Sequence, residues 1–236
     1  MAKPKIIITI DGPAGSGKST IARLLAERLG LDCLDTGAMY RVVAWILKKQ
    51  KKENLSGEAL TIFLKKLEFE IKGNGPEQKV LAHGEDVSQE IRTPEISRLA
   101  SAVSMKPEVR SVLAEKQKAL GRQGALIAEG RDMGTVIFPQ ADYKIFLDAS
   151  LKVRARRRYE ELIQRGLPVV LKEVEQEMET RDRQDQERAL APLRPAPGAW
   201  VVDTSHLSIQ EVVQFISSRI FKDTKLRSMI SGSVEP

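Results

Sequence analysis

The sequence contains little of what several common kinds of site require. It has one cysteine, Cys33, so an internal disulfide and a metal site built from cysteines are both excluded. Its two histidines, His83 and His206, lie far apart in the sequence, which disfavours a histidine-centred metal site or catalytic triad. Aromatic residues make up only 5% of the chain, too few for an extended surface that stacks on nucleic-acid bases.

Long apolar segments are also missing. No hydrophobic run approaches the length of a membrane-spanning helix, and the N-terminal MAKPKIIITIDG has too short an apolar core for a signal peptide. We therefore expect a cytoplasmic protein with no membrane partner. A chain of 236 residues suits one compact domain. Its net charge of +6 indicates an anionic partner, and nucleic acid, a membrane surface and a small polyphosphate all fit that charge.

Apolar runs alternate with helical patterns along most of the chain. Strands are expected at residues 5–10, 31–35, 125–129, 143–148 and 200–204. Helices are expected after residue 18 and at 38–50, 56–66, 150–165 and 171–190, with further starts at Pro94 and Pro107 and a last one capped by Ser208 and Glu211. Ser56 is expected to cap the helix at 56–66. The alternation predicts an α/β fold, a parallel sheet flanked by helices.

A hairpin pattern interrupts this alternation. Residues 67–72 (LEFEIK) and 78–83 (QKVLAH) alternate between apolar and polar side chains, and the glycine- and proline-containing 73–77 (GNGPE) predicts the turn between them. A hairpin within a chain that otherwise alternates strand and helix indicates a β-rich insertion.

A phosphate-binding loop follows the first strand. Residues 12–19 (GPAGSGKS) match the pattern G-x-x-x-x-G-K-[ST] between a predicted strand and a predicted helix, the context that the mechanism requires. Backbone N–H groups of such a loop surround phosphate oxygens, Lys18 supplies a cation, and the Ser19 hydroxyl is a candidate Mg²⁺ ligand. The expected ATP-binding residues are Gly12, Pro13, Ala14, Gly15, Ser16, Gly17, Lys18, Ser19 and Thr20.

The rest of the chain excludes several classes of protein that bind a nucleoside triphosphate. A switch GTPase reads guanine through an N-K-x-D element, but Asn54 and Asn74 are followed by Leu-Ser and Gly-Pro. A nucleic-acid motor would offer a separate binding module, and none is evident. The small size points to phosphoryl transfer to a small acceptor. Glu129 ends a predicted strand, where either a Mg²⁺-linked role or a structural role fits.

Three polar segments form a candidate acceptor site. They are 35–41 (DTGAMYR), 129–136 (EGRDMGTV) and 181–188 (RDRQDQER). The first two follow predicted strands and so emerge at the carboxyl edge of the sheet, where ligands bind in doubly wound folds. On a helix, Arg181, Asp185 and Arg188 would share one face.

The sequence resembles the cytidylate kinase family of nucleoside monophosphate kinases. The resemblance rests on the blocks DGPAGSGKST, LDTGAMYR, EIRT, IAEGRDMGTVIFP, KIFLDAS, RARRR, RDRQDQERALAPL and VVDTS, which run in family order over about residues 5–220. It implies a P-loop NTPase-type sheet in a single kinase domain, 1–221. That domain would contain a nucleoside-monophosphate-binding insertion at about 63–100 and a helical, arginine-bearing lid at about 152–170. Residues 222–236 are expected to form a flexible tail.

The resemblance also implies a role for each candidate residue. Asp132 would accept from the exocyclic amine of cytosine, and Arg110 would face the ring acceptors. The residues expected to bind CMP are Thr36, Tyr40, Arg41, Ser101, Arg110, Arg131, Asp132, Arg181, Asp185 and Arg188. The residues expected to act in catalysis are Lys18, Arg131, Arg157, Arg158 and Arg188. Of the lid arginines, Arg157 and Arg158 are favoured over Arg156, which lies off the face that Arg154 and Arg158 share.

The implied reaction converts ATP and CMP into ADP and CDP, with dCMP as a second acceptor and Mg²⁺ as cofactor. The implied enzyme is a monomer that acts on small molecules and binds no nucleic acid. Two alternatives stay open: a kinase for UMP or another small phosphate acceptor, and a P-loop regulator that binds nucleic acid through its basic surface. A steep salt dependence of nucleic-acid binding would favour the regulator.

Overall fold

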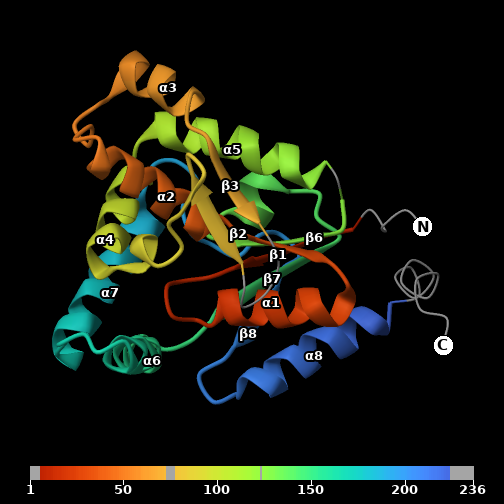
Figure 1. Cartoon of the computed structure of the whole chain (residues 1–236). Coiled ribbons are helices and arrows are strands. Elements are labelled where there is room, and N and C mark those ends of the chain that lie inside the picture. Colours follow the sequence, from red (N-terminus) through yellow and green to blue (C-terminus); the bar gives the residue numbers. More distant parts are fainter. Residues whose placement is uncertain (1–5, 73–77, 123, 224–236) are drawn as a thin grey trace. The chain divides into compact units, whose positions relative to one another are not determined.

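The computed structural model describes residues 6–72, 78–122 and 124–223. The chain divides into two compact units. One, the core unit, comprises Met1–Cys33 and Gln123–Pro236, and the other, the inserted unit, comprises Leu34–Arg122. Figure 1 shows the helices and strands of both units along the chain.

A five-stranded sheet forms the centre of the core unit. Its strand order is β2-β6-β1-β7-β8, and β1 pairs in parallel with both β6 and β7, as β7 does with β8. The strands are β1 (Ile7–Asp11), β2 (Asp32–Asp35), β6 (Leu126–Gly130), β7 (Tyr143–Asp148) and β8 (Trp200–Asp203). The inner strands are mostly buried and rich in apolar residues, as expected for a parallel sheet flanked by helices. Strand β2 spans the boundary between the two units.

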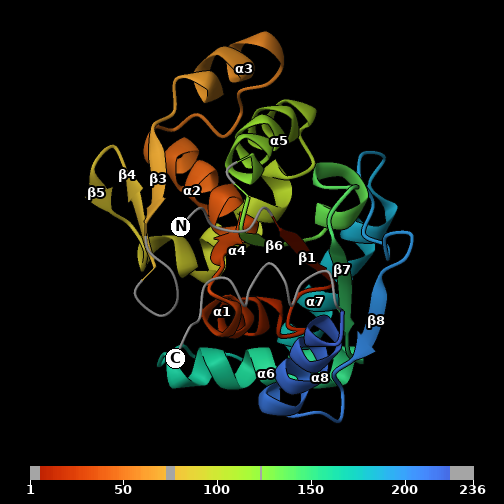
Figure 2. The same cartoon turned by 90° about the vertical axis from the view of Figure 1, so that its right-hand side faces the viewer.

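Helices α1 (Lys18–Leu29) and α8 (Ile209–Phe221) cover one face of this sheet. They lie side by side in both views (Figures 1 and 2). Their buried side chains, Ile21 and Leu25 from α1 and Ile216 and Ile220 from α8, pack with the strand residues in one hydrophobic core. Two further helices, α6 (Leu151–Gln164) and α7 (Leu171–Glu187), pack together around a small separate cluster: Ala155, Leu162, Val174 and Met178.

The inserted unit combines helices with a small antiparallel sheet. Its strands are β3 (Phe69–Lys72), β4 (Lys79–Ala82) and β5 (Glu85–Asp86), and β4 pairs with both neighbours. Its helices are α2 (Thr36–Lys49), α3 (Gly57–Lys65), α4 (Pro94–Val103) and α5 (Pro107–Gly121), with a short 3₁₀ turn at Glu90–Arg92. The expected hairpin is therefore confirmed, and the predicted insertion at 63–100 lies within this unit.

The predicted α/β architecture, a parallel sheet flanked by helices, is also confirmed. Ser56 is the N-cap residue of α3, as expected, but its side chain makes no capping hydrogen bond. The carboxylate of Glu108 accepts from the Gly57 N–H instead. The expected turn at 73–77 and nearly all of the expected tail lie outside the described residues. Within the described ranges, no helix is long and apolar enough to cross a membrane.

The capping box predicted for α8 is present, and its contribution to the stability of the fold can be measured. Ser208 Oγ accepts from the Glu211 N–H at 3.2 Å, and a Glu211 carboxylate oxygen accepts from the Ser208 N–H at 2.7 Å. Ser208→Ala should lower the free energy of unfolding by about 1 kcal/mol, because the first turn of α8 loses its acceptor. Urea unfolding measures this, and Ser218→Ala near the other end of α8 is the matched control. Equal losses in both variants would contradict the assignment.

Candidate active site

The phosphate-binding loop begins at Gly12, directly after β1. Gly12 has a φ of 151°, and a Cβ atom placed there would lie 2.0 Å from the carbonyl oxygen of Leu147 in β7. No other residue fits, because its side chain would collide with the backbone of the neighbouring strand. The tight approach fixes the start of the loop against the carboxyl end of the sheet.

The loop then closes on the carbonyl oxygen of Pro13. That oxygen accepts from the Ser16 hydroxyl at 3.0 Å and from the Lys18 ammonium at 2.6 Å. Gly17, with a φ of 93°, is the N-cap of α1 and has no side chain to cap the helix. The first-turn N–H groups of α1 are thus left for an anion, which the helix dipole also favours. Together these features describe a phosphate cradle.

Lys18 is buried at the base of this cradle. Burial lowers the pKa of its ammonium group to about 7, and the positive charges of Arg131 and Arg181 lower it further, while Glu129 and Asp185 act in the opposite direction. A buried amine with cations around it favours its neutral form until an anion arrives. The cluster around Lys18 is therefore poised to bind negative charge.

Ser19 and Glu129 lie next to each other at the same end of the sheet. The Ser19 hydroxyl donates to Glu129 Oε1 at 2.7 Å, which joins the first turn of α1 to the end of β6. Among the described residues, no three His, Cys, Asp or Glu side chains are grouped to hold a metal by themselves. Mg²⁺ that accompanies a triphosphate needs only one or two protein oxygens, which this hydroxyl and carboxylate can provide. The donor set therefore fits Mg²⁺.

Arg131 and Asp185 form a charged pair in the core unit. Arg131 Nε donates to Asp185 Oδ2 at 2.9 Å. Burial by itself would raise the pKa of Asp185, but the charges of Arg131 and Arg181 lower it overall. Burial likewise opposes the charged form of Arg131, yet Asp185 raises the pKa of that guanidinium. Both groups thus stay ionised.

Arg188 joins the same group of charges from the end of α7. Its Nη1 lies 3.5 Å from Asp185 Oδ1, and its Nε donates to the Ala191 carbonyl at 2.7 Å. One expectation is wrong here: α7 ends at Glu187, and Arg188 follows it with extended backbone (φ −58°, ψ 138°) rather than lying on a continuing helical face. Arg188 still meets Asp185, because the chain turns back and the Leu193 N–H donates to the Asp185 carbonyl.

The arginines of the predicted lid differ in what they contact. Arg154 is buried and donates to the carbonyl oxygens of Ala149 and Ala14, so it holds the phosphate-binding loop. Arg157 donates to the hydroxyl and carbonyl of Thr204, at 3.1 and 2.6 Å, in the segment after β8. Arg156 and Arg158 form helix-surface pairs with Glu160 and Glu161. In this conformation Arg157 and Arg158 are engaged within the protein.

The inserted unit holds the other predicted acceptor residues. Asp35 caps α2 by accepting from the Ala38 N–H at 2.8 Å, and its other oxygen pairs with Arg41 at 2.8 Å. Thr36 is buried in the first turn of the same helix. Arg110 of α5 is also buried; it donates to the Ser104 carbonyl at 3.3 Å and lies 6.0 Å from the centroid of the Tyr40 ring. Ser101 lies in α4. Within this unit, Tyr40 and Arg110 are brought together.

Asp11 was not among the predicted site residues. It is 2% exposed, and its carboxylate accepts from the backbone N–H groups of Met133 and Gly134. Burial raises its pKa to about 6 despite these two hydrogen bonds. The available signal was an acidic residue at the end of a mostly apolar strand, directly before the first loop glycine.

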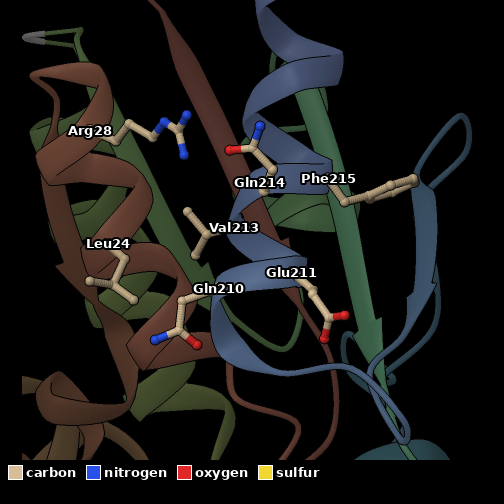
Figure 3. Close-up of a pocket in the computed structure, with 7 residues that line it drawn as sticks. All are labelled: Leu24, Arg28, Gln210, Glu211, Val213, Gln214 and Phe215. Atoms are coloured by element: carbon tan, nitrogen blue, oxygen red, sulfur yellow. The ribbon is translucent and has the colours of Figure 1, made fainter.

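A surface groove lies elsewhere on the core unit, between α1 and α8. It has a volume of about 750 Å³ and is lined by Leu24, Arg28, Gln210, Glu211, Val213, Gln214 and Phe215. Figure 3 shows the side chains of Leu24 and Arg28 from α1 across from those of Gln210, Val213 and Gln214 from α8. None of these residues belongs to the phosphate-binding loop or to the predicted acceptor set. The groove is therefore separate from the candidate active site.

Comparison with known proteins agrees with this geometry. Residues 8–222 match the profile of the family described as cytidylate kinase. A cytidylate kinase of Oleidesulfovibrio alaskensis is 46% identical over 215 residues, which cover 91% of this chain and 98% of the relative. A cytidylate kinase of Pasteurella multocida is 44% identical, covering 89% of this chain and 92% of the relative.

Two further matches concern length and fold. A bifunctional pantoate ligase/cytidylate kinase of Synechococcus sp. is 49% identical over 88% of this chain, and this chain spans 41% of that relative's length. The solved structure of a shikimate kinase from Bacteroides thetaiotaomicron has a TM-score of 0.51 at 12% identity, covering 92% of this chain and 98% of that one, which supports the fold alone. The profile match over most of the chain, with relatives that it covers almost completely, shows what the sequence motifs predicted: this protein belongs to the cytidylate kinase family.

Proposed function

We propose that this protein transfers the γ-phosphoryl group of ATP to CMP, and to dCMP as a second acceptor, giving ADP and CDP or dCDP. The observation that carries the proposal is the charge cluster of the core unit. Lys18 lies buried in the phosphate-binding loop. Arg131, which donates to Asp185 at 2.9 Å, is close enough to Lys18 to lower the pKa of the Lys18 ammonium group. Phosphoryl transfer between two phosphates requires cations of this kind beside a loop that binds the donor.

The proposed mechanism relies on positioning and charge neutralisation. The nucleophile is an oxygen of the CMP phosphate, which is already ionised near neutral pH, so no general base is required. Lys18 and the N-terminus of α1 bind the triphosphate, while Arg131 and Arg188 orient the attacking phosphate and offset its repulsion from the donor. A lid that carries Arg157 and Arg158 would exclude water from the γ-phosphate, for which these arginines must exchange their present partners.

Mg²⁺ is the proposed cofactor. Ser19 and Glu129 would hold it, Ser19 through its hydroxyl and Glu129 directly or through a water. There it would supply positive charge that offsets the negative charge of the triphosphate. The hydrogen bond between Ser19 and Glu129 supports this assignment, because it orients both oxygen groups beside the loop.

Asp132 is the proposed reader of the base. Its carboxylate would accept from the exocyclic amine of cytosine, whereas uracil would set a carbonyl oxygen against it. Its side chain is buried, and an unsatisfied pair of acceptors in a buried site is costly, which supports strong discrimination. The residues of the inserted unit keep the roles that the family resemblance implies. We propose, as the family resemblance implies, a monomer that acts on small molecules and binds no nucleic acid.

Asp132 provides the test of substrate choice. We expect ADP release with CMP and dCMP to exceed that with UMP, AMP and GMP in the presence of ATP and Mg²⁺. In Asp132→Ala, kcat/KM for CMP should fall about 5–150-fold, since 1–3 kcal/mol of base recognition is lost. Asp132→Asn offers an amide N–H to uracil and should raise kcat/KM for UMP relative to CMP.

The matched control is Glu179→Gln, a carboxylate-to-amide change at an exposed position of α7. It should leave all five rates unchanged. A wild-type enzyme that accepts every monophosphate equally, or releases ADP without one, would contradict the proposed acceptor. Retained preference for CMP in both Asp132 variants would contradict the base-reading role alone.

A further inference from the structure

Asp11 links two loops that are distant in the sequence. It is the last residue of β1, directly before the first glycine of the phosphate-binding loop. Its Oδ1 accepts from the Met133 N–H at 2.9 Å, and its Oδ2 accepts from the Gly134 N–H at 2.8 Å. Both carboxylate oxygens are therefore used on consecutive N–H groups of another segment, and none of the roles described above employs this side chain.

The segment that Asp11 holds carries the proposed acceptor residues Arg131 and Asp132. Directly after them the chain forms a π-helical turn, Met133–Ile137, in which the Asp132 carbonyl accepts from the N–H groups of Val136 at 2.9 Å and Ile137 at 3.2 Å. The peptide between Asp132 and Met133 is thus fixed at both ends, its carbonyl by the turn and its N–H by Asp11. A peptide plane held at both ends restricts the backbone rotations of the two residues that it joins, and so limits the directions in which their side chains can leave the backbone.

Packing supports the same connection. A Cβ atom at Gly134 would lie 2.9 Å from the Thr9 hydroxyl and 3.4 Å from Asp11 Oδ2, so the turn sits directly against β1 with no spare room. Thr9 and Asp11 are two residues apart on one strand and share a face. The Thr9 hydroxyl is buried and has no hydrogen-bond partner, so Asp11 supplies the polar contact on this side of the turn.

We infer that Asp11 is a positioning residue that aligns the acceptor-binding Arg131–Asp132 segment with the phosphate-binding loop. The inference rests on the proposed function, because it assigns Arg131 and Asp132 to the acceptor. Asp11 itself touches no substrate. Burial disfavours the ionised form of Asp11 and raises the pKa of its carboxyl group to about 6. The two backbone N–H groups and Lys18 lower this pKa, and the charge of Asp132 raises it. Only the carboxylate offers an acceptor to both N–H groups at once.

The test is Asp11→Asn, which keeps the size of the side chain and leaves one acceptor for two N–H groups. We expect kcat to fall about 100-fold, as for a misalignment of about 1 Å, and the Kd for CMP to rise about 10-fold. The Kd for ADP with Mg²⁺, measured by calorimetry, should stay within about 2-fold, since the phosphate cradle is intact. Thr9→Val is the matched control: it removes a buried polar group from the same face of β1 without removing a hydrogen bond, so its kinetic constants should equal those of the wild type.

Two results would overturn the inference. One is an Asp11→Asn enzyme with wild-type kcat and CMP affinity. The other is an equal loss of ADP and CMP affinity, which is what general weakening of the fold would cause. If the variant does not fold, amide hydrogen exchange of the wild type decides. Binding of ADP with Mg²⁺ alone should slow exchange at Met133 and Gly134, and unchanged exchange there would refute the coupling. This measurement needs no CMP, so it stands even if the wild type proves inactive toward CMP and the proposed function fails.

Discussion

Lys18→Met is expected to lower kcat by at least about 100-fold and up to about 1,000-fold, the range seen when one preorganised donor to a developing charge is removed. Lys18 donates to the Pro13 carbonyl at 2.6 Å, which places its amino group inside the phosphate cradle. Methionine fills similar space without the charge. A coupled ADP-release assay measures the loss.

The same substitution is expected to stabilise the fold, which separates catalysis from folding. The pKa of Lys18 is lowered from 10.5 to about 7, so between these values the unfolded chain binds a proton that the folded protein does not. Stability therefore rises with pH across this window and is lowest below about pH 7, where the folded protein must hold a buried cation. Lys18→Met should have a higher melting temperature at pH 7 and lack this pH dependence.

Nucleotide binding should raise the lowered pKa of Lys18 again. At pH 8 the Lys18 amine is largely neutral, and the negative charge of a bound triphosphate raises its pKa, so binding should take up close to one proton per site. The nucleotide phosphates are already ionised at that pH and contribute little. Calorimetry in buffers of different ionisation enthalpy measures the uptake.

Lys18→Arg is the control for proton uptake, since its guanidinium stays charged throughout and should take up none. Equal uptake by wild type and Lys18→Arg would assign the proton to another group. A Lys18→Met enzyme with wild-type kcat would remove Lys18 from the mechanism.

Local patterns in the sequence predicted those parts of the fold that depend on neighbours along the chain. The apolar run before Gly12 and the amphipathic run after Lys18 place the loop between β1 and α1. Two-residue alternation predicts the pairing of β3 with β4, and Ser208 with Glu211 predicts the start of α8. In each case the determining residues lie within a few positions of one another.

Features that depend on distant contacts could not be read in this way. The π-helical turn at Met133–Ile137 is capped by Asp11, which lies 122 residues before Met133 in the chain. Nothing within the arginine-rich VRARRR distinguishes Arg154 from its neighbours, yet Arg154 is buried and donates to the distant carbonyl of Ala14. The prediction that Arg188 lies on the helical face was wrong for a similar reason: α7 ends at Glu187, where the returning chain bonds to the Asp185 carbonyl.

Arg154→Met is expected to lower the free energy of unfolding by about 3–5 kcal/mol, as for other buried pairs that lose one partner. Arg154 Nη2 lies 2.7 Å from Asp182 Oδ2, and both side chains are largely buried. The other oxygen of Asp182, Oδ1, is buried without a hydrogen-bond partner, so removing Arg154 leaves this buried carboxylate without its ion-pair partner. Urea unfolding measures the change.

Two variants separate the buried pair from the basic character of α6. Arg156→Met removes an exposed guanidinium that pairs with Glu160 four residues further along the same helix, and it should leave the unfolding midpoint unchanged. Arg154→Met with Asp182→Leu removes both buried charges and should recover much of the lost stability, because an apolar pair needs no compensation. Equal effects of Arg154→Met and Arg156→Met would refute the special role of Arg154. If the double variant is stable but binds ADP more weakly than the wild type, Arg154 serves the phosphate-binding loop through the Ala14 carbonyl as well as the fold.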